Sequence, residues 1–342
     1  MTLLAPDDPR WTTALARLEH DVYHLPGYVS VCAEEEGGEP RAYLYEDGAN
    51  VFLCPLIVRA IQDSRWHDAA SPYGYPGPLC SGPHEFLESA LARFLSELRD
   101  VGIVSVFVRC HTLLGAPSDI LARHGVLVDH GSTVSVDLAL PAEALEQQLR
   151  DNHRRDIEKL VRRGAWVDRD GDWRHLPEFM LAYRQTMRRV GATSGYFFAE
   201  RYFQRLHDAL GPHVHLFTAR VMGRIAAAGL FFELCGIVQY HLGGTFDEHV
   251  DANAMKLLLH EVSLWARARG ARVHHLGGGV GAQDDALLHF KSGFSPRRHA
   301  FRTWRAICAP EPYQDLVRAW EVRAGRAADS SGRFFPAYRA LG

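Results

Sequence analysis

The sequence has few of the features that mark a disulfide-bonded, secreted or membrane-spanning protein. Its six cysteines are scattered and form no Cys-x-x-Cys pair, which argues against a disulfide framework or a cysteine zinc site and favours reduced thiols in the cytoplasm. The start of the chain, 1–11, is polar and holds two prolines, unlike a signal peptide. The most apolar run, 225–240, is interrupted by Glu233 and Gly236, so it predicts a hairpin and no membrane span.

Basic and acidic residues are nearly equal in number. The 38 basic and 41 acidic residues leave a formal net charge of -3, which argues against a DNA-binding protein or one that coats nucleic acid, and leaves a local basic patch open. Heptad runs and low-complexity tails are absent. The histidine pairs His213/His215 and His274/His275 have no carboxylate partner at ligand spacing, so no metal site is assigned.

Two stretches of the chain, offset by 168 residues, follow the same plan. In each, a helix ends at a glycine, a buried strand follows, and a short helix ends at a second glycine. Gly102 and Gly125 are 23 residues apart, and so are Gly270 and Gly293. Glycine in a left-handed conformation commonly ends a helix. The repeat therefore predicts two tandem α/β domains, and the length allows two domains of about 150 residues each.

Hydrophobic periodicity and turn residues predict alternating helices and strands in both halves. Helices are expected over 11–23, 85–99, 141–163, 176–190, 200–210, 254–269 and 285–291. Strands are expected over 40–45, 51–61, 103–108, 133–138, 214–221, 225–234, 237–242, 273–276 and 300–306. The expected organisation is a first domain at 1–140, a linking basic helix at 141–165, a second domain at 166–310 and a C-terminal tail at 311–342.

The element order and four motifs give the chain a resemblance to the Fem-type branch of the GNAT superfamily, in its armless double-GNAT form. The motifs are Tyr73-Gly-Tyr-Pro-Gly-Pro78, Asn152-His-Arg-Arg-Asp-Ile157, Tyr240-His-Leu-Gly-Gly-Thr245 and Phe290-Lys-Ser-Gly-Phe294, and the resemblance covers about 20–306. It implies an α/β (α+β) fold of tandem GNAT-like acyltransferase domains, with mixed sheets flanked by helices. It also implies an enzyme that forms an amide bond.

The donor that the resemblance implies is aminoacyl-tRNA, with no cofactor, and the acceptor is the amine of a peptide, a peptidoglycan precursor or a natural-product intermediate. The alternative is an acyl-CoA-dependent N-acyltransferase. CoA-binding GNAT domains carry a Q/R-x-x-G-x-G/A loop, whose amides cradle pyrophosphate at a helix N-terminus. Here the nearest register is His249-Val-Asp-Ala-Asn-Ala254, which lacks the first glycine and adds Asp251. A third reading is a degenerate double-GNAT binding protein without activity.

Two residues are candidates for catalysis. In Fem-type enzymes the lysine of a Phe-Lys pair lies near the acyl ester, which here selects Lys291; a fixed ammonium stabilises negative charge on the carbonyl oxygen during attack by an amine. The alternative is a solvated lysine in the last turn of a helix. His241 is placed to take a proton from the attacking amine, or else is a structural strand histidine.

The candidate binding residues fall into five groups. Tyr73 and Tyr75 belong to a rigid Gly-Pro loop that suits an acceptor or serves only as a connector. Arg154 and Arg155 lie on a helix at 150–163 with a net charge of +3, which suits phosphate binding or is a solvated face with i,i+4 ion pairs. The remaining candidates are Arg188 and Tyr196 for the acceptor, Tyr240 and Phe290 for the cleft, and Gly277, Gly278 and Gly279 for the donor.

Overall fold

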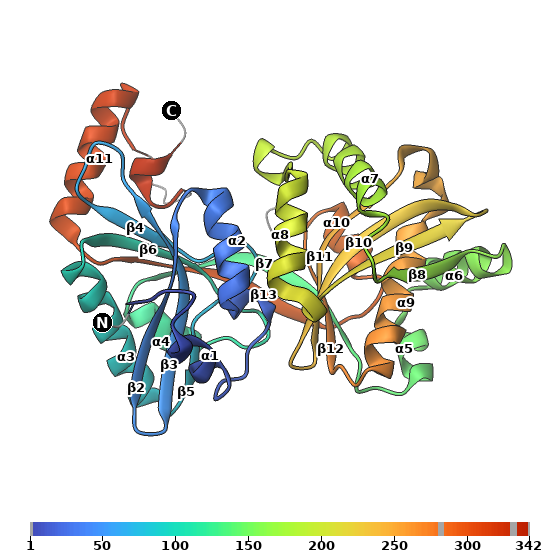
Figure 1. Ribbon diagram of the computed structural model, residues 1–342, viewed down its shortest axis with the longest axis horizontal. Helices are drawn as coiled ribbons and strands as arrows, with labels where there is room; N and C mark the ends of the chain where they lie inside the picture. The colour runs from blue at the N-terminus through green and yellow to red at the C-terminus, as the bar shows by residue number, and fades with distance from the viewer. Residues whose placement is uncertain (1–2, 280–283, 329–333, 341–342) are drawn as a thin grey trace. The chain divides into compact units, whose positions relative to one another are not determined.

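The computed structural model describes residues 3–279, 284–328 and 334–340. It divides into two compact units (Figure 1). The first unit contains residues 1–130 and 301–342, and the second contains residues 131–300. The chain passes between the units within two strands, β7 (Val126–Asp137) and β13 (Arg298–Ile307). The expected boundaries at 140, 165 and 310 therefore differ from those of the structure.

The first unit is a mixed sheet with helices on both faces. Its strand order is β1-β2-β3-β4-β6-β13, with β5 paired to β3, and β4 and β6 are its parallel pair. The strands are β1 (Leu3–Leu4), β2 (Glu39–Asp47), β3 (Asn50–Ala60), β4 (His67–Ala70), β5 (Leu79–Ser81) and β6 (Ile103–Arg109). The helices are α1 (Pro9–Leu15), α2 (Pro26–Glu36), α3 (His84–Asp100), α4 (Ser118–Arg123) and α11 (Pro310–Ala324).

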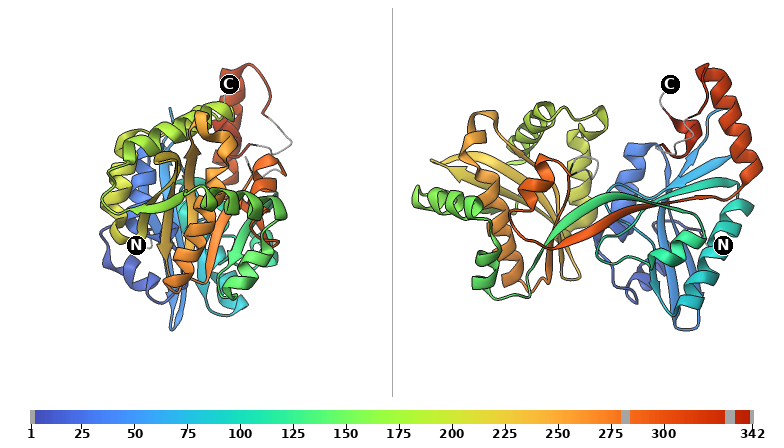
Figure 2. Two further views of the ribbon diagram at one scale, coloured as in Figure 1. Left: turned by 90° about the vertical axis from the view of Figure 1, so that its right-hand side faces the viewer. Right: turned by 180° about the vertical axis from the view of Figure 1, so that it is seen from behind.

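The second unit repeats this plan. Its strand order is β8-β9-β10-β11-β12-β7, and β11 and β12 are its parallel pair. The strands are β8 (Trp166–Asp170), β9 (Val214–Val221), β10 (Arg224–Leu234), β11 (Ile237–Thr245) and β12 (Val273–Gly278). The helices are α5 (Ala142–Gln148), α6 (Asp151–Arg162), α7 (Leu176–Arg189), α8 (Glu200–Leu210), α9 (Ala254–Ala268) and α10 (Ala286–Lys291). Helices α7 and α8 cover one face of this sheet and α9 the other (Figure 2).

The last strand of each sheet comes from the other half of the sequence. In the first unit, Thr303–Ile307 of β13 pair antiparallel with β6. In the second, Thr133–Asp137 of β7 pair antiparallel with β12. The order of antiparallel and parallel neighbours is otherwise the same in both sheets. The prediction of tandem GNAT-like domains is therefore confirmed, with the final strands exchanged.

The exchanged strand carries part of the first unit's core. Trp304 of β13 is fully buried, stacks at 6.2 Å on Phe94 of α3, and donates its indole N–H to the carbonyl of Leu121 at 2.8 Å. Phe94 also packs at 4.8 Å against Tyr43 of β2. Burying one such aromatic side chain contributes about 2–3 kcal/mol, so a first half without β13 lacks a large share of its core.

The four glycines of the repeat have two different reasons to be glycine. Gly102 and Gly270 adopt φ values of +84° and +83°, as expected for a helix end in the left-handed region. Gly125 and Gly293 do not have positive φ, and for them the expected left-handed cap is wrong. A Cβ on Gly125 would lie 2.6 Å from the carbonyl oxygen of Arg305, so close backbone packing explains that glycine.

Several expected elements differ in extent. The helix expected over 141–163 is broken between α5 and α6, because the backbone N–H of Arg150 donates to the carbonyl of Gly293 at 2.8 Å and leaves the helical ladder. The helix expected over 11–23 ends at Leu15. Helices α2 and α11 and strand β8 were not predicted.

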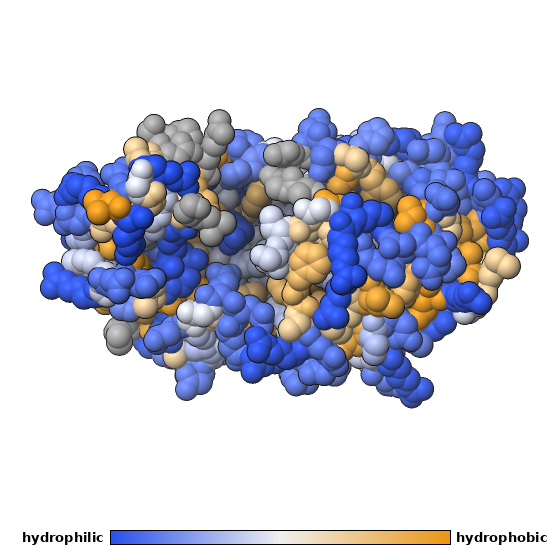
Figure 3. Space-filling view, turned by 90° about the horizontal axis from the view of Figure 1, so that it is seen from above, coloured by the Kyte–Doolittle hydropathy of each residue, from blue (hydrophilic) through white to orange (hydrophobic). Residues whose placement is uncertain are grey.

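Within the described residues, every helix is too short or too polar to cross a bilayer. On the face drawn in Figure 3, hydrophilic side chains interrupt the apolar ones over the second unit.

Candidate functional site

The parallel strands of the second unit separate part-way along their length. β11 and β12 pair only where Ile237–Gln239 face Val273–His275. Beyond this point β11 continues against β10, and β12 continues against β7. A β-bulge in each strand, at His241 and at Leu276, accompanies the separation. The result is a wedge that begins at Tyr240, and a wedge between parallel strands exposes backbone to a ligand.

The corresponding strands of the first unit stay joined. Beyond β4, the N–H of Ser71 donates to the carbonyl of Phe107 at 2.8 Å, and the N–H of Arg109 donates to the Ser71 hydroxyl at 2.9 Å. The Arg109 side chain also donates to the carbonyl of Ser71 at 2.9 Å. These bonds occupy the backbone that the wedge leaves open in the second unit.

Lys291, in the last turn of α10, reaches this wedge. Its residue is only 7% exposed, and its ammonium donates to the carbonyl of Gly278 at 2.7 Å. The Nζ atom also lies 5.7 Å from the ring centroid of Tyr240. Burial lowers the pKa of Lys291 to about 7, opposed in part by the charge of Asp285. The lysine is therefore not a solvated helix-end residue.

The N-terminus of α6 holds α10 in place. His153 is 2% exposed and donates from Nε2 to the carbonyl of Phe290 at 2.9 Å. Burial lowers the pKa of His153 to about 4, so the ring stays neutral, with the proton that this bond requires on Nε2. A Cβ on Gly293 would overlap the His153 ring. At the other end of α10, the carboxylate of Asp285 accepts from the N–H of Leu288 at 2.8 Å and caps the helix.

The ring of Tyr240 lies next to the ammonium of Lys291. Its hydroxyl donates to the sulfur of Met255 at 3.7 Å, and burial raises the pKa of the phenol, so the ring is neutral. A Cβ on Gly243 would overlap the Tyr240 hydroxyl, so this glycine leaves room for the ring. Of the predicted residues, the structure brings Lys291, Tyr240 and Gly278 together.

The other two donor glycines and Phe290 border this group. Gly277 adopts a φ of +75° immediately after the bulge of β12, and Gly279 follows the end of the strand. Phe290 is half-buried and packs its ring 5.4 Å from His153 and 5.6 Å from Phe294. Phe290 therefore belongs to the contact between α10 and α6.

His241 lies on the opposite face of β11 from Tyr240. Its ring packs at a tilt against Phe232, with centroids 4.3 Å apart, and its Nε2 lies 3.2 Å from the hydroxyl of Tyr202 on α8. Burial lowers the pKa of His241 to about 3. Because a general base needs a pKa closer to the working pH and must reach the substrate, this placement favours the structural alternative for His241.

The predicted arginines lie on helix surfaces. Arg154 donates to the carboxylate of Asp151 at 2.5 Å, and Arg155 donates to the carbonyl of Asp151 at 3.2 Å, as in the alternative of a helix face with local pairs. Arg188 is exposed at the end of α7. Tyr196 follows α7, and its carbonyl accepts from the hydroxyl of Tyr183 at 2.8 Å.

Tyr73 and Tyr75 lie in the first unit, on the irregular loop after β4. The carbonyl of Tyr73 accepts from the hydroxyl of Tyr28 at 2.9 Å. Tyr75 packs edge-on at 5.4 Å against Phe301. Gly74 has a φ of +96°, and a Cβ there would overlap Tyr23. The loop is therefore rigid, and it belongs to the first unit, whereas the wedge belongs to the second.

The sequence did not point to the residues that position Lys291. His153 lies inside the motif Asn152-His-Arg-Arg-Asp-Ile157, but the arginines were chosen there because of their charge. Lys256 on α9 donates to the carboxylate of Asp156 on α6 at 2.6 Å and joins these helices. For this ion pair, the only signal in the sequence was Lys256 itself, a charged residue at an otherwise apolar position of the helix.

Comparison with known proteins assigns the class. Residues 147–292 match the family described as an acetyltransferase (GNAT) domain, and they span most of the second unit. The match therefore assigns a GNAT-type acyltransferase domain to the second unit. No curated protein matches the chain.

Solved structures share the fold across nearly the whole chain. FemX superposes with a TM-score of 0.71 and 13% identity, covering 92% of this chain and 99% of FemX. The C-terminal domain of a putative lysylphosphatidylglycerol synthetase from Agrobacterium fabrum gives a TM-score of 0.56 and 13% identity, over 92% and 95% of the two chains. L-PGS from Bacillus licheniformis gives a TM-score of 0.54 and 14% identity, over 87% of this chain and 91% of L-PGS.

Proposed function

We propose that the protein transfers an aminoacyl group from aminoacyl-tRNA to the amine of a peptide, a peptidoglycan precursor or a natural-product intermediate. The observation that carries this proposal is the buried ammonium of Lys291 in the wedge between β11 and β12. The likeness to FemX, a similarity of fold, is consistent with it.

The chemistry follows from the charge on Lys291. When the acceptor nitrogen attacks the ester carbonyl, a C–N bond forms and the carbonyl oxygen gains negative charge. The ester C–O bond then breaks, and the tRNA hydroxyl leaves with a proton. A fixed ammonium in a buried site stabilises the charged oxygen, and losing one such group costs about 3–4 kcal/mol of barrier.

The turn before α9 supports the tRNA donor over acyl-CoA. It folds as a 3₁₀ helix at Asp247–Ala252, where the N–H of His249 donates to the carbonyl of Phe246 and the N–H of Asn253 donates to that of Val250. Amides bonded within the turn are not available to cradle pyrophosphate. Asp251 adds a negative charge beside the same turn.

The acceptor is assigned to two groups of residues. Tyr73 and Tyr75 offer rigid rings in the first unit; in the second, Arg188 lies in the last turn of α7 and Tyr196 follows that helix. Arg154 and Arg155 are assigned to phosphate groups of the donor, because their guanidinium groups stand on the exposed part of α6.

The donor is tested with purified protein, a pool of charged radiolabelled tRNAs and a panel of amine acceptors. Label is expected in a small product, RNase is expected to abolish its formation, and removal of CoA is expected to leave it unchanged. Tight stoichiometric binding of acetyl-CoA by calorimetry, with transfer from acetyl-CoA and none from charged tRNA, would instead establish the acyl-CoA alternative.

A further inference from the structure

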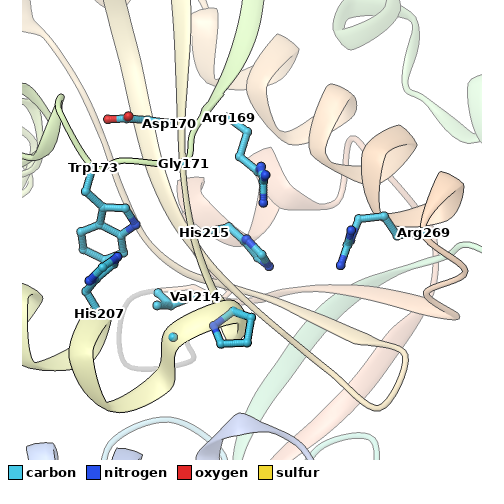
Figure 4. Close-up of a pocket in the computed structure, with 10 residues that line it drawn as sticks. Arg169, Asp170, Gly171, Trp173, His207, Val214, His215 and Arg269 are labelled. Carbon is cyan, nitrogen blue, oxygen red and sulfur yellow. The ribbon is translucent and has the colours of Figure 1, made fainter.

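A second cavity, of about 200 Å³, lies in the second unit at the other end of the sheet from the wedge. The end of β8, the turn after it, the end of α8 and the start of β9 surround it, together with Arg269 just beyond α9 (Figure 4). The wedge begins beyond Gln239, whereas this cavity lies where β9 begins and β10 ends. The two are therefore separate sites.

Two arginines and a histidine lie on one side of the cavity. Arg169, His215 and Arg269 point toward a common space in Figure 4. Glu233 fixes two of them, because its carboxylate accepts from Nε2 of His215 at 2.9 Å and from Nε of Arg269 at 2.9 Å. Burial lowers the pKa of His215, and the charge of Glu233 opposes this change. The charges of Arg169 and Arg269 lower the pKa further, so both arginines lie close enough to act on the His215 ring.

Arg169 has unused hydrogen-bond donors. Its guanidinium makes no hydrogen bond or ion pair with the part of the chain that the structure describes, whereas its backbone pairs with β9. The neighbouring carboxylate of Asp170 points away from it in Figure 4 and accepts from the backbone N–H of His175 at 2.6 Å. A guanidinium with free donors beside a second arginine suits a phosphate, which accepts several hydrogen bonds at once.

The opposite side of the cavity is aromatic. Trp173 and His207 pack edge-to-face, with ring centroids 4.8 Å apart. Trp173 has a φ of +53°, a left-handed conformation that is unfavourable for a large side chain. Such strain persists only when surrounding contacts hold it, and it concentrates at functional sites. Here it keeps an indole at the edge of a cationic cavity.

We propose that this cavity binds a nucleotide unit, with the phosphate among Arg169, His215 and Arg269 and the base along Trp173 and His207. Aromatic side chains stack on nucleobases of any sequence, which complements the phosphate contacts. The unit belongs either to a free mononucleotide or to an RNA strand, since both present the same chemistry. The inference does not depend on the role of Lys291, because no part of the wedge enters it.

The test measures binding by calorimetry with AMP, adenosine, inorganic phosphate and an uncharged tRNA transcript. The variants are Arg169→Gln and Trp173→Leu. Arg174→Gln is the matched control, because Arg174 is 78% exposed and pairs at 2.7 Å with Asp172. AMP is expected to bind more tightly than adenosine or phosphate, and Arg169→Gln is expected to weaken it about tenfold. Trp173→Leu is expected to weaken it severalfold, and the control to stay within twofold.

The tRNA arm separates the two sources. If only the transcript binds, and Arg169→Gln weakens it about tenfold, the nucleotide belongs to RNA and the proposal stands. The proposal is overturned if neither AMP nor tRNA binds, or if both cavity variants, shown folded by thermal melting, keep all affinities within twofold. Because the readout is binding, this failure is distinct from a failure of aminoacyl transfer.

Discussion

Lys291 combines two properties that a sequence pattern cannot give together. Its position before Gly293 is visible in the motif Phe290-Lys-Ser-Gly-Phe294, and the resemblance that rests on this motif selected it. Its burial and its bond to the carbonyl of Gly278 depend on β12, which contacts α10 only in the folded unit. The residue was therefore predictable as a candidate, whereas the depressed pKa was not.

The buried lysine should make the stability of the protein depend on pH in a defined window. Its pKa is about 7 in the folded state and 10.5 ordinarily, so between these values the unfolded chain binds a proton that the folded chain lacks. Stability contributed at this site therefore rises as the pH rises from about 7 to 10.5. Lys291→Met removes the penalty and should be more stable than wild type by a few kcal/mol below pH 7, with the difference shrinking toward pH 10.5.

Urea unfolding at pH 6, 8 and 10 measures this difference. Lys159→Met is the control, because Lys159 is exposed on α6 and its replacement should give a difference that does not vary with pH. An equal stability difference for Lys291→Met at pH 6 and at pH 10 would show that the lysine is not desolvated.

At the scale of elements, the sequence predicted well where apolar periodicity is strong. Strand β9 and helix α8 match the expected ranges, and β10, α9 and α7 differ by a residue at one end. The prediction from sequence failed where tertiary contacts determine the end of an element. The break between α5 and α6 depends on a bond from Arg150 to Gly293, which lies far away in sequence. His153 escaped notice for the same reason.

The contact between α6 and α10 should be sensitive to a single methyl group. In Gly293→Ala the new Cβ overlaps the buried His153 ring, so α10 or α6 must shift. Overpacking of this kind typically costs about 1–3 kcal/mol, and here it should also lower kcat because Lys291 moves with α10. Gly195→Ala is the control, since a Cβ there meets nothing within 4 Å. Thermal unfolding and turnover of both variants decide the matter, and unchanged values for Gly293→Ala would refute the contact.

At the scale of the whole molecule, the repeat was visible in sequence but the strand exchange was not. The 23-residue spacing of glycines marks helix, strand and helix in both halves. This spacing does not indicate which of the two sheets pairs with the strand that follows the second glycine. The two candidates, β7 and β13, are both strands with apolar residues, so only pairing with β12 and β6 distinguishes them.

The exchange predicts that the halves depend on each other to fold. A fragment of residues 1–140 lacks Trp304 and the rest of β13, so expressed alone it should not unfold cooperatively. Co-expression with residues 141–342 supplies that strand and should restore a soluble complex. Calorimetric melting of the single and co-expressed fragments is the measurement. A cooperative transition of 1–140 alone would contradict the exchange.

Buried histidines should make the second unit sensitive to acid. Burial is the main cause that lowers the pKa of His153 to about 4 and those of His241 and His274 to about 3. Below pH 6.5 each of these histidines binds a proton in the unfolded chain but stays unprotonated in the folded chain. The free energy of unfolding therefore falls as the pH drops from 6.5 toward 4. The slope approaches roughly 4 kcal/mol per pH unit for three sites. His153→Gln should lessen the slope by about a third, and a melting temperature constant from pH 7 to 5 would rule this out.

The most direct test of the account is single-turnover transfer from charged tRNA by wild type and Lys291→Met at saturating acceptor. We expect the variant to fold, to bind the donor with little change, and to react about 100-fold to 1000-fold more slowly, because the ammonium acts mainly in the transition state. Lys159→Met should react at the wild-type rate. A Lys291→Met rate close to that of wild type would contradict the assignment of the wedge as the site of acyl transfer.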